Sequence, residues 1–180
     1  QGFYIIDFDK IARDVCAAGS PCLAELAAEF GGGITAPDGS LRRRALGDMV
    51  FRDGDKLKKL NGITRKYILA EARRLREQCE AQGRDIVYDA PLLFEAGLDR
   101  ECDFVIAVTA GRQTRIERIM ARDGISLDTA RGRLDAQHGN EYYERRSDFR
   151  ARNDGTEEEL FAELGDILVK IEDRIHDNNS

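Results

Sequence analysis

This chain of 180 residues lacks several features that would mark a membrane, secreted or metal-binding protein. No apolar run approaches the ~18 residues that a membrane helix needs, and no signal-peptide pattern is present. None of the four cysteines forms a Cys-x-x-Cys pair, and no histidine lies near Cys16 and Cys22, which argues against metal binding. We therefore expect free, largely buried thiols, no contact with a membrane, and a reducing cytoplasmic environment.

Charge is distributed unevenly along the chain. The net charge of -6 argues against a general nucleic-acid binder. Residues 111–152, however, hold ten arginines and no lysine, against seven acidic residues. Arginine without lysine favours forked recognition of phosphate oxygens. The alternative is a solvated helical pair held by salt bridges. The segment is thus a candidate phosphate contact.

Short apolar runs alternate with helical patterns, which predicts one α/β domain with parallel strands covered on both faces. A strand pattern in the first nine residues leads into a helix, and further strands are expected at 85–89, 104–108 and, as a short edge strand, 149–152. Helical patterns run from Ser20-Pro21 to the glycines at 31–33, over 55–81, over 112–122 and 127–137, and from the capping box Thr156-x-x-Glu159 onward.

Carboxylates stand where two of these strands end. Asp7 and Asp9 lie at a predicted strand–helix junction, where one could point into a site while the other caps the helix. For Asp9 a pure capping role is the alternative to accepting a proton or binding Mg²⁺. Asp89 could orient metal-bound water near a triphosphate, and Leu92 and Leu93 just beyond it could wall a ligand; an ordinary turn is the alternative. Ligands of open α/β sheets bind at the carboxyl ends of the strands, so we expect a site here.

A set of short motifs, spread over nearly the whole chain in a consistent order, gives the sequence its resemblance to the dephospho-coenzyme A kinase family. These motifs are Ile6-Asp7-Phe8-Asp9 with Ala12-Arg13, Phe30-Gly31, Gly39-x-Leu41-x-Arg43-x-x-Leu46, Val50-Phe51, Leu60-Asn61-x-Ile63, Pro91-Leu92-Leu93-Phe94-Glu95, Arg118-x-x-x-Arg122-Asp123, Arg133-x-x-x-Gln137, and Ser147-Asp148 followed by Asn153.

The resemblance implies a P-loop kinase similar to the nucleoside monophosphate kinases, with a parallel five-stranded sheet flanked by helices. It implies one kinase domain with a core (1–18, 84–111, 148–180), a helical acceptor-binding subdomain (19–83) and a helical lid (112–147). It also implies transfer of the γ-phosphoryl group of ATP, with Mg²⁺, to the 3′-hydroxyl of dephospho-coenzyme A. Small-molecule substrates, no nucleic acid, and a monomer or weak homo-oligomer are expected.

Site residues carried over from the resemblance fall into four groups. Asp9 would be the catalytic base, and Asp89 would reach the metal through water. The acceptor would lie against Arg43, Asn61, Leu92, Leu93 and Glu95. ATP and the lid would involve Arg118, Arg122, Arg133 and Asn153. In such a lid, Ile116, Ile119 and Leu134 should pack mainly on each other.

Three departures from the family pattern stand out. No GxxxxGK[ST] loop occurs in the sequence, which starts Gln1-Gly2; we expect that loop, with the central strand of the sheet, upstream of residue 1. Arg65-Lys66 replaces the family's His-Pro, and Arg42 replaces its Asp. A kinase of another small hydroxyl acceptor, or an inactive nucleotide- or coenzyme A-binding paralogue, therefore remains an alternative.

Overall fold

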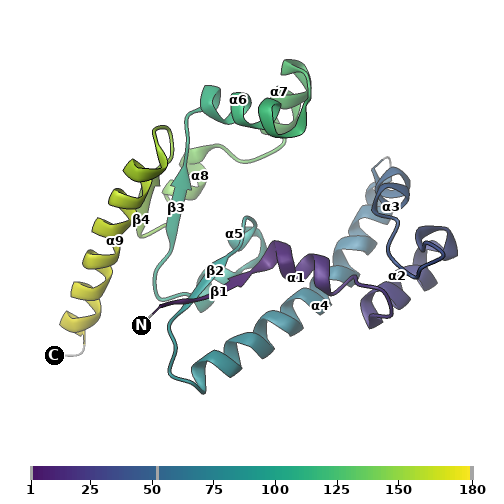
Figure 1. Ribbon diagram of the computed structural model, residues 1–180, viewed down its shortest axis with the longest axis horizontal. Helices are drawn as coiled ribbons and strands as arrows, with labels where there is room; N and C mark the ends of the chain where they lie inside the picture. Colours follow the sequence, from purple (N-terminus) through teal and green to yellow (C-terminus); the bar gives the residue numbers. More distant parts are fainter. Residues whose placement is uncertain (1, 52, 179–180) are drawn as a thin grey trace. The chain divides into compact units, whose positions relative to one another are not determined.

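The chain contains two compact units, which divide between Leu93 and Phe94 (Figure 1). The structure, a computed structural model, describes residues 2–51 and 53–178. Each unit holds one pair of parallel strands with helices packed against it. The predicted α/β class with parallel strands flanked by helices is therefore confirmed.

In the first unit, the strand–helix order follows the sequence patterns. Its elements are β1 (Tyr4–Asp7), α1 (Phe8–Asp14), α2 (Pro21–Phe30), the 3-10 turn η1 (Gly32–Ile34), α3 (Arg43–Val50), α4 (Gly54–Glu80) and β2 (Ile86–Asp89). β1 and β2 pair in parallel, in a register that sets Asp7 opposite Asp89. The predicted strand ends therefore lie next to each other.

Side-chain caps explain where the long helices of this unit begin. The Ser20 Oγ accepts a hydrogen bond from the Leu23 backbone N–H at 3.1 Å, and Pro21 takes the first helical position of α2. One carboxylate oxygen of Asp53 accepts from two backbone N–H groups in the first turn of α4, each at 3.1 Å. These bonds satisfy donors that the helix itself leaves unpaired.

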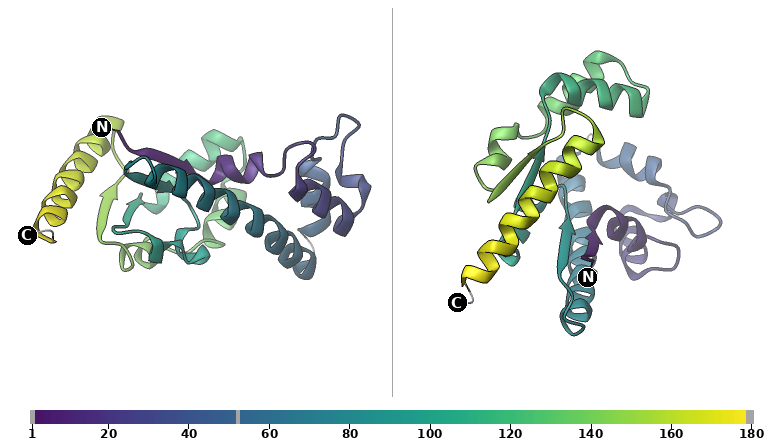
Figure 2. Two further views of the ribbon diagram at one scale, coloured as in Figure 1. Left: turned by 90° about the horizontal axis from the view of Figure 1, so that it is seen from below. Right: turned by 60° about the vertical axis from the view of Figure 1, so that its left-hand side comes forward.

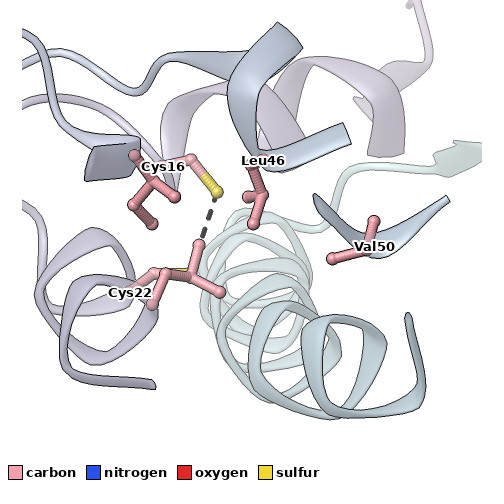
Figure 3. Packing of buried hydrophobic residues seen from close by; sticks show 6 residues of the cluster. Cys16, Cys22, Leu46 and Val50 are labelled. Atoms are coloured by element: carbon pink, nitrogen blue, oxygen red, sulfur yellow. Dashed lines mark hydrogen bonds between the residues drawn. The ribbon is translucent and has the colours of Figure 1, made fainter. Parts of the chain in front are cut away.

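The helical part of the first unit packs around a small apolar core (Figure 3). Cys16 and Cys22 lie at its centre with their Sγ atoms 3.8 Å apart, together with Leu46 and Val50. Both thiols are free and buried, as the sequence predicts. They serve here as small apolar side chains.

The second unit is built around β3 and β4. Its elements are α5 (Leu93–Ala96) at the boundary, η2 (Leu98–Glu101), β3 (Ile106–Thr109), α6 (Arg112–Asp123), α7 (Leu127–Asp135), α8 (Asn140–Glu144), β4 (Phe149–Arg152) and α9 (Glu157–Asn178). The predicted strand over 149–152 is confirmed, and α9 lies along it (Figures 1 and 2), with Ile167 packed against Phe149 and Ala151. The Thr156–Glu159 capping box is present, with reciprocal bonds of 2.9 and 3.3 Å.

The α6–α7 hairpin carries a core of its own. Ile116, Ala130 and Leu134 are buried together, and Ile119 packs against them. This is the packing that the sequence predicts for a separate helical hairpin. The short helix α8, which follows it, has no counterpart in the sequence-based expectation.

Coverage of both sheet faces was predicted, and this expectation is wrong for the β1–β2 pair. In β1 the side chain of Ile6 is buried at 1% exposure, whereas Ile5 is 62% exposed beside its exposed partner Val87. Alternate residues of a strand face opposite sides, and the helices of the first unit cover only one of them. In the β3–β4 pair both faces hold buried residues: Phe149 and Ala151 lie on the face that packs on α9, and Ala107 and Thr109 lie on the other, although Val108 is 53% exposed. Within the described ranges no helix is long and apolar enough to cross a membrane.

Candidate active site

The two aspartates at the β1–α1 junction have different environments. Asp7 is the N-cap of α1, because its Oδ1 accepts a hydrogen bond from the Lys10 backbone N–H at 2.8 Å. Asp9 lies in the first turn of the same helix and is exposed, and no described residue bonds to its carboxylate. Asp7 therefore caps α1, and a capping role does not explain the presence of Asp9.

A third carboxylate lies beside this junction. Asp89 ends β2, is exposed, and pairs in register with Asp7 on the neighbouring strand. The described residues contain no group of three or more His, Cys, Asp or Glu that could hold a metal ion. Mg²⁺ in proteins usually keeps several water ligands and is bound through one or two carboxylates together with substrate phosphates. A single carboxylate such as that of Asp89 would suit such a site.

The start of α3 lies against the end of α1. The Nη2 of Arg43 donates to the backbone oxygen of Arg13 at 3.5 Å, and Arg13 lies one turn after Asp9 on α1. The Nη1 of Arg42 donates to the backbone oxygen of Gly33 at 3.3 Å. Neither guanidinium has a carboxylate partner among the described residues. A hollow of about 350 Å³ opens here, lined by Arg42, Arg43, Arg44, Ala45 and Asp48.

Lys66, one of the departures from the family pattern, has a structural partner. Its Nζ donates to the Glu25 Oε2 at 2.6 Å, and the same oxygen accepts from the hydroxyl of Tyr67 at 2.6 Å. These bonds hold the pKa of the Glu25 carboxyl below its usual range and raise the pKa of Lys66. Lys66 thus ties α4 to α2. Asn61 is exposed on α4.

Leu92, Leu93 and Glu95 lie on either side of the unit boundary. Leu92 is 65% exposed and Leu93 is half-buried at the start of α5. The Oε1 of Glu95 accepts a long hydrogen bond, 3.4 Å, from the hydroxyl of Tyr143. Burial, followed by the charge of Glu95, raises the pKa of Tyr143.

The predicted ATP-binding residues fall into two contacts within the second unit. The Nη1 of Arg118 donates to the backbone oxygen of Asn153 at 2.7 Å, which joins α6 to the end of β4. Arg122 and Arg133 both bind the carboxylate of Asp123. The structure therefore brings together Arg118 with Asn153, and Arg122 with Arg133. No hydrogen bond between these two pairs occurs in the described part of the chain.

Sequence reasoning missed two carboxylates that bind arginines of the second unit, Asp123 with Arg122 and Arg133, and Asp154 with Arg152. Asp154 accepts from the backbone N–H of Gly111, the N-cap of α6, at 2.5 Å, and from Nη2 of Arg152 at 3.0 Å. The bond from Gly111 is the main reason that the pKa of Asp154 is lowered. Asp123 directly follows Arg122 in one of the quoted motifs, and Asp154 directly follows Asn153. Adjacency to a predicted site residue was the available signal.

Parallel strands flanked by helices, with the Asp9 and Asp89 carboxylates beside the strand ends, define an α/β protein of the class that binds its ligand at the carboxyl edge of the sheet. The sequence profile of the family described as "Dephospho-CoA kinase" matches residues 1–159. The chain belongs to the dephospho-CoA kinase family.

Three proteins are similar to this chain over most of its length. The dephospho-CoA kinase of Thermobifida fusca is 38% identical over 176 residues, covering 98% of this chain and 88% of that protein. The solved structure of dephospho-CoA kinase from Campylobacter jejuni superposes with a TM-score of 0.68 at 26% identity, covering 99% of this chain and 88% of that one. A solved Thermus thermophilus protein gives a TM-score of 0.73 at 29% identity, covering 94% and 85%.

Proposed function

We propose that this protein transfers the γ-phosphoryl group of ATP to the 3′-hydroxyl of dephospho-coenzyme A, giving coenzyme A. One observation supports this beyond family membership: α1 is capped by Asp7, which leaves the Asp9 carboxylate unpaired in its first turn. A carboxylate with no partner of its own is available to a substrate hydroxyl. We assign the reaction to the cytoplasm, in a monomer or weak homo-oligomer.

In this proposal Asp9 accepts the proton that the 3′-hydroxyl loses as it attacks the γ-phosphorus. Phosphoryl transfer depends mainly on positioning and charge neutralisation, so the base supplies only part of the rate. The cap bond from Asp7 fixes the helix that carries Asp9. Arg43, which contacts the other end of α1, would bind the acceptor, with Asn61, Leu92, Leu93 and Glu95 as further acceptor contacts.

Charge on the triphosphate is countered by cations in the same proposal. Arg118, Arg122 and Arg133 would bind phosphate oxygens, and Asn153 would lie near the adenine. Mg²⁺, when bound, neutralises phosphate charge, and Asp89 would hold one of its water ligands. The region 19–83 would bind the acceptor and 112–147 would act as the lid.

The test is the release of ADP that depends on dephospho-coenzyme A, measured with the intact encoded protein. Asp9→Asn should lower kcat by ~10²-fold or more, the scale of a lost acid–base group. Asp7→Asn is the matched control: asparagine also caps helices well, so kcat should change little. Equal losses in the two variants, or no loss in Asp9→Asn, would contradict the role of Asp9.

A kinase of a different small hydroxyl acceptor is the second candidate. It is favoured by Arg42, whose exposed guanidinium faces the hollow at α3 and has only a backbone oxygen as a described partner. Comparing ADP release with dephospho-coenzyme A and with free nucleosides or nucleoside monophosphates separates the two. ATP binding without turnover of any of these acceptors would instead indicate an inactive paralogue.

A further inference from the structure

Asp123 gathers two arginines onto one carboxylate. The Nε of Arg122 donates to Oδ1 at 2.7 Å and its Nη2 to Oδ2 at 3.1 Å. The Nη1 of Arg133 donates to Oδ2 at 2.5 Å. The Asp123 side chain is only 21% exposed, whereas those of Arg122 and Arg133 are 74% and 53% exposed. The carboxylate is therefore less exposed than the two guanidinium groups that bind it, both of which reach solvent.

The position of this carboxylate is fixed by the hairpin itself. Asp123 is the last residue of α6, and Gly124 ends the helix in the left-handed conformation at φ 63°. Arg133 comes from the last turn of α7, next to the buried Leu134, which packs on Ile116 of α6. Because helix packing sets where Asp123 lies, its carboxylate is a fixed anchor for two long, flexible side chains.

Each arginine keeps donors for another ligand. A guanidinium has five N–H donors in a planar fork. Arg122 uses its Nε–Nη2 edge on Asp123, which leaves Nη1 free of that contact. Arg133 donates to Asp123 through Nη1 and keeps the opposite edge. One negative charge also offsets the repulsion between the two cations and leaves the group net positive.

We propose that Asp123 is a positioning residue for the kinase reaction: it holds Arg122 and Arg133 as a pair whose free N–H edges bind phosphate oxygens of ATP. This inference rests on the proposed role of these two arginines in ATP binding. It adds a residue that touches neither substrate and acts through those that do.

Two other roles of Asp123 would have different effects on ATP binding. If Asp123 competed with phosphate for the two guanidinium groups, removing its charge would strengthen ATP binding. If the contact were only a surface ion pair, removing its charge would change nothing, since exposed pairs contribute little. The Michaelis constant for ATP separates all three cases.

The experiment measures steady-state kinetics of Asp123→Asn in the intact protein, with ATP and dephospho-coenzyme A varied in turn. We expect KM for ATP to rise about 5–20-fold, with kcat and KM for the acceptor within about twofold of the parent, because uniform binding of the nucleotide is lost. The matched control is Asp135→Asn, which removes an exposed carboxylate that binds Arg112 at 2.7 Å and neither arginine of the pair. Its kinetics should equal the parent's.

Arginine variants separate this inference from the proposed function. Arg133→Ala should also raise KM for ATP. In the Arg133→Ala background, Asp123→Asn should raise KM for ATP much less than it does in the parent protein. If Arg122→Ala and Arg133→Ala leave KM for ATP unchanged, the proposed ATP contact fails. If those variants raise it while Asp123→Asn leaves it unchanged or lowers it, only the positioning role is overturned.

Thermal unfolding of each variant checks that the hairpin persists. Should Asp123→Asn unfold below the assay temperature, Asp123→Glu gives the same test, because it keeps the charge and displaces the carboxylate by one methylene. A raised KM for ATP at unchanged kcat in Asp123→Glu supports the positioning role, and an unchanged KM overturns it.

Discussion

Alkylation of Cys22 provides a quantitative test of the core of the first unit. The Cys22 side chain has no exposure, and burial together with the neighbouring Cys16 thiol raises its pKa to about 12. A free cysteine has a pKa of about 8.5, so roughly a quarter of it is thiolate at pH 8. At the same pH the thiolate fraction of Cys22 is about 10⁻⁴. Only the thiolate reacts, so Cys22 should be alkylated more than ~10³-fold more slowly than in the denatured chain.

The assay is mass-spectrometric labelling of each cysteine with iodoacetamide, in native buffer and in denaturant. Cys102, which is half-buried, serves as the internal reference for the native protein. Between pH 8 and 11 the Cys22 rate should rise about tenfold per pH unit. Because the pKa of Cys22 is higher in the folded protein than in the unfolded chain, the unfolded chain loses this proton at lower pH. The free energy of unfolding should therefore fall as the pH rises from about 9 towards 12. Native labelling of Cys22 within tenfold of its denatured rate at pH 8 would refute the reasoning.

Two further perturbations test the same unit. Leu26→Ala removes a fully buried side chain from the core around Cys22 and should lower the free energy of unfolding, measured by urea titration, by about 3 kcal/mol. The control is Leu57→Ala, at a side chain that is 42% exposed, which should lower the free energy of unfolding far less. Asp7→Ala removes the α1 cap and should lower the free energy of unfolding by about 1 kcal/mol. It should also lower kcat, because the helix that carries Asp9 loses its cap, whereas Asp7→Asn should not. Equal stability of the two variants would show that the cap bond is not needed.

Local signals were the most reliable part of the sequence prediction. The caps at Ser20 and at Thr156–Glu159 depend only on residues three positions apart, and both are present. The strands and their parallel pairing followed from apolar runs that alternate with helices. Coverage of the sheet faces was not predictable in this way, because it depends on which elements pack on each face.

The same limit applies to the candidate site. Sequence alone could not decide whether Asp7 or Asp9 caps α1, because the answer depends on the residue at which the backbone turns helical. Spacing placed Arg118 and Arg122 on one face of a helix. Their contacts nevertheless differ, because Arg118 reaches Asn153 on β4 and Arg122 turns to Asp123. Long side chains choose partners from the tertiary structure, which no local pattern contains.

The helix α4 has a consequence for how the first unit can be changed. It runs without proline for 27 residues, about 40 Å at 1.5 Å per residue, and packs on β1, α1, α2 and α3. Leu60, Ile63 and Tyr67 in its first half pack on the core shared with α2 and α3. It therefore joins β1 and α1 to the small core formed with α2 and α3 through one continuous helix. Exchanging residues 19–53 for those of a relative would leave this helix unchanged. Inserting or deleting a single residue within α4 would rotate one end against the other by about 100°.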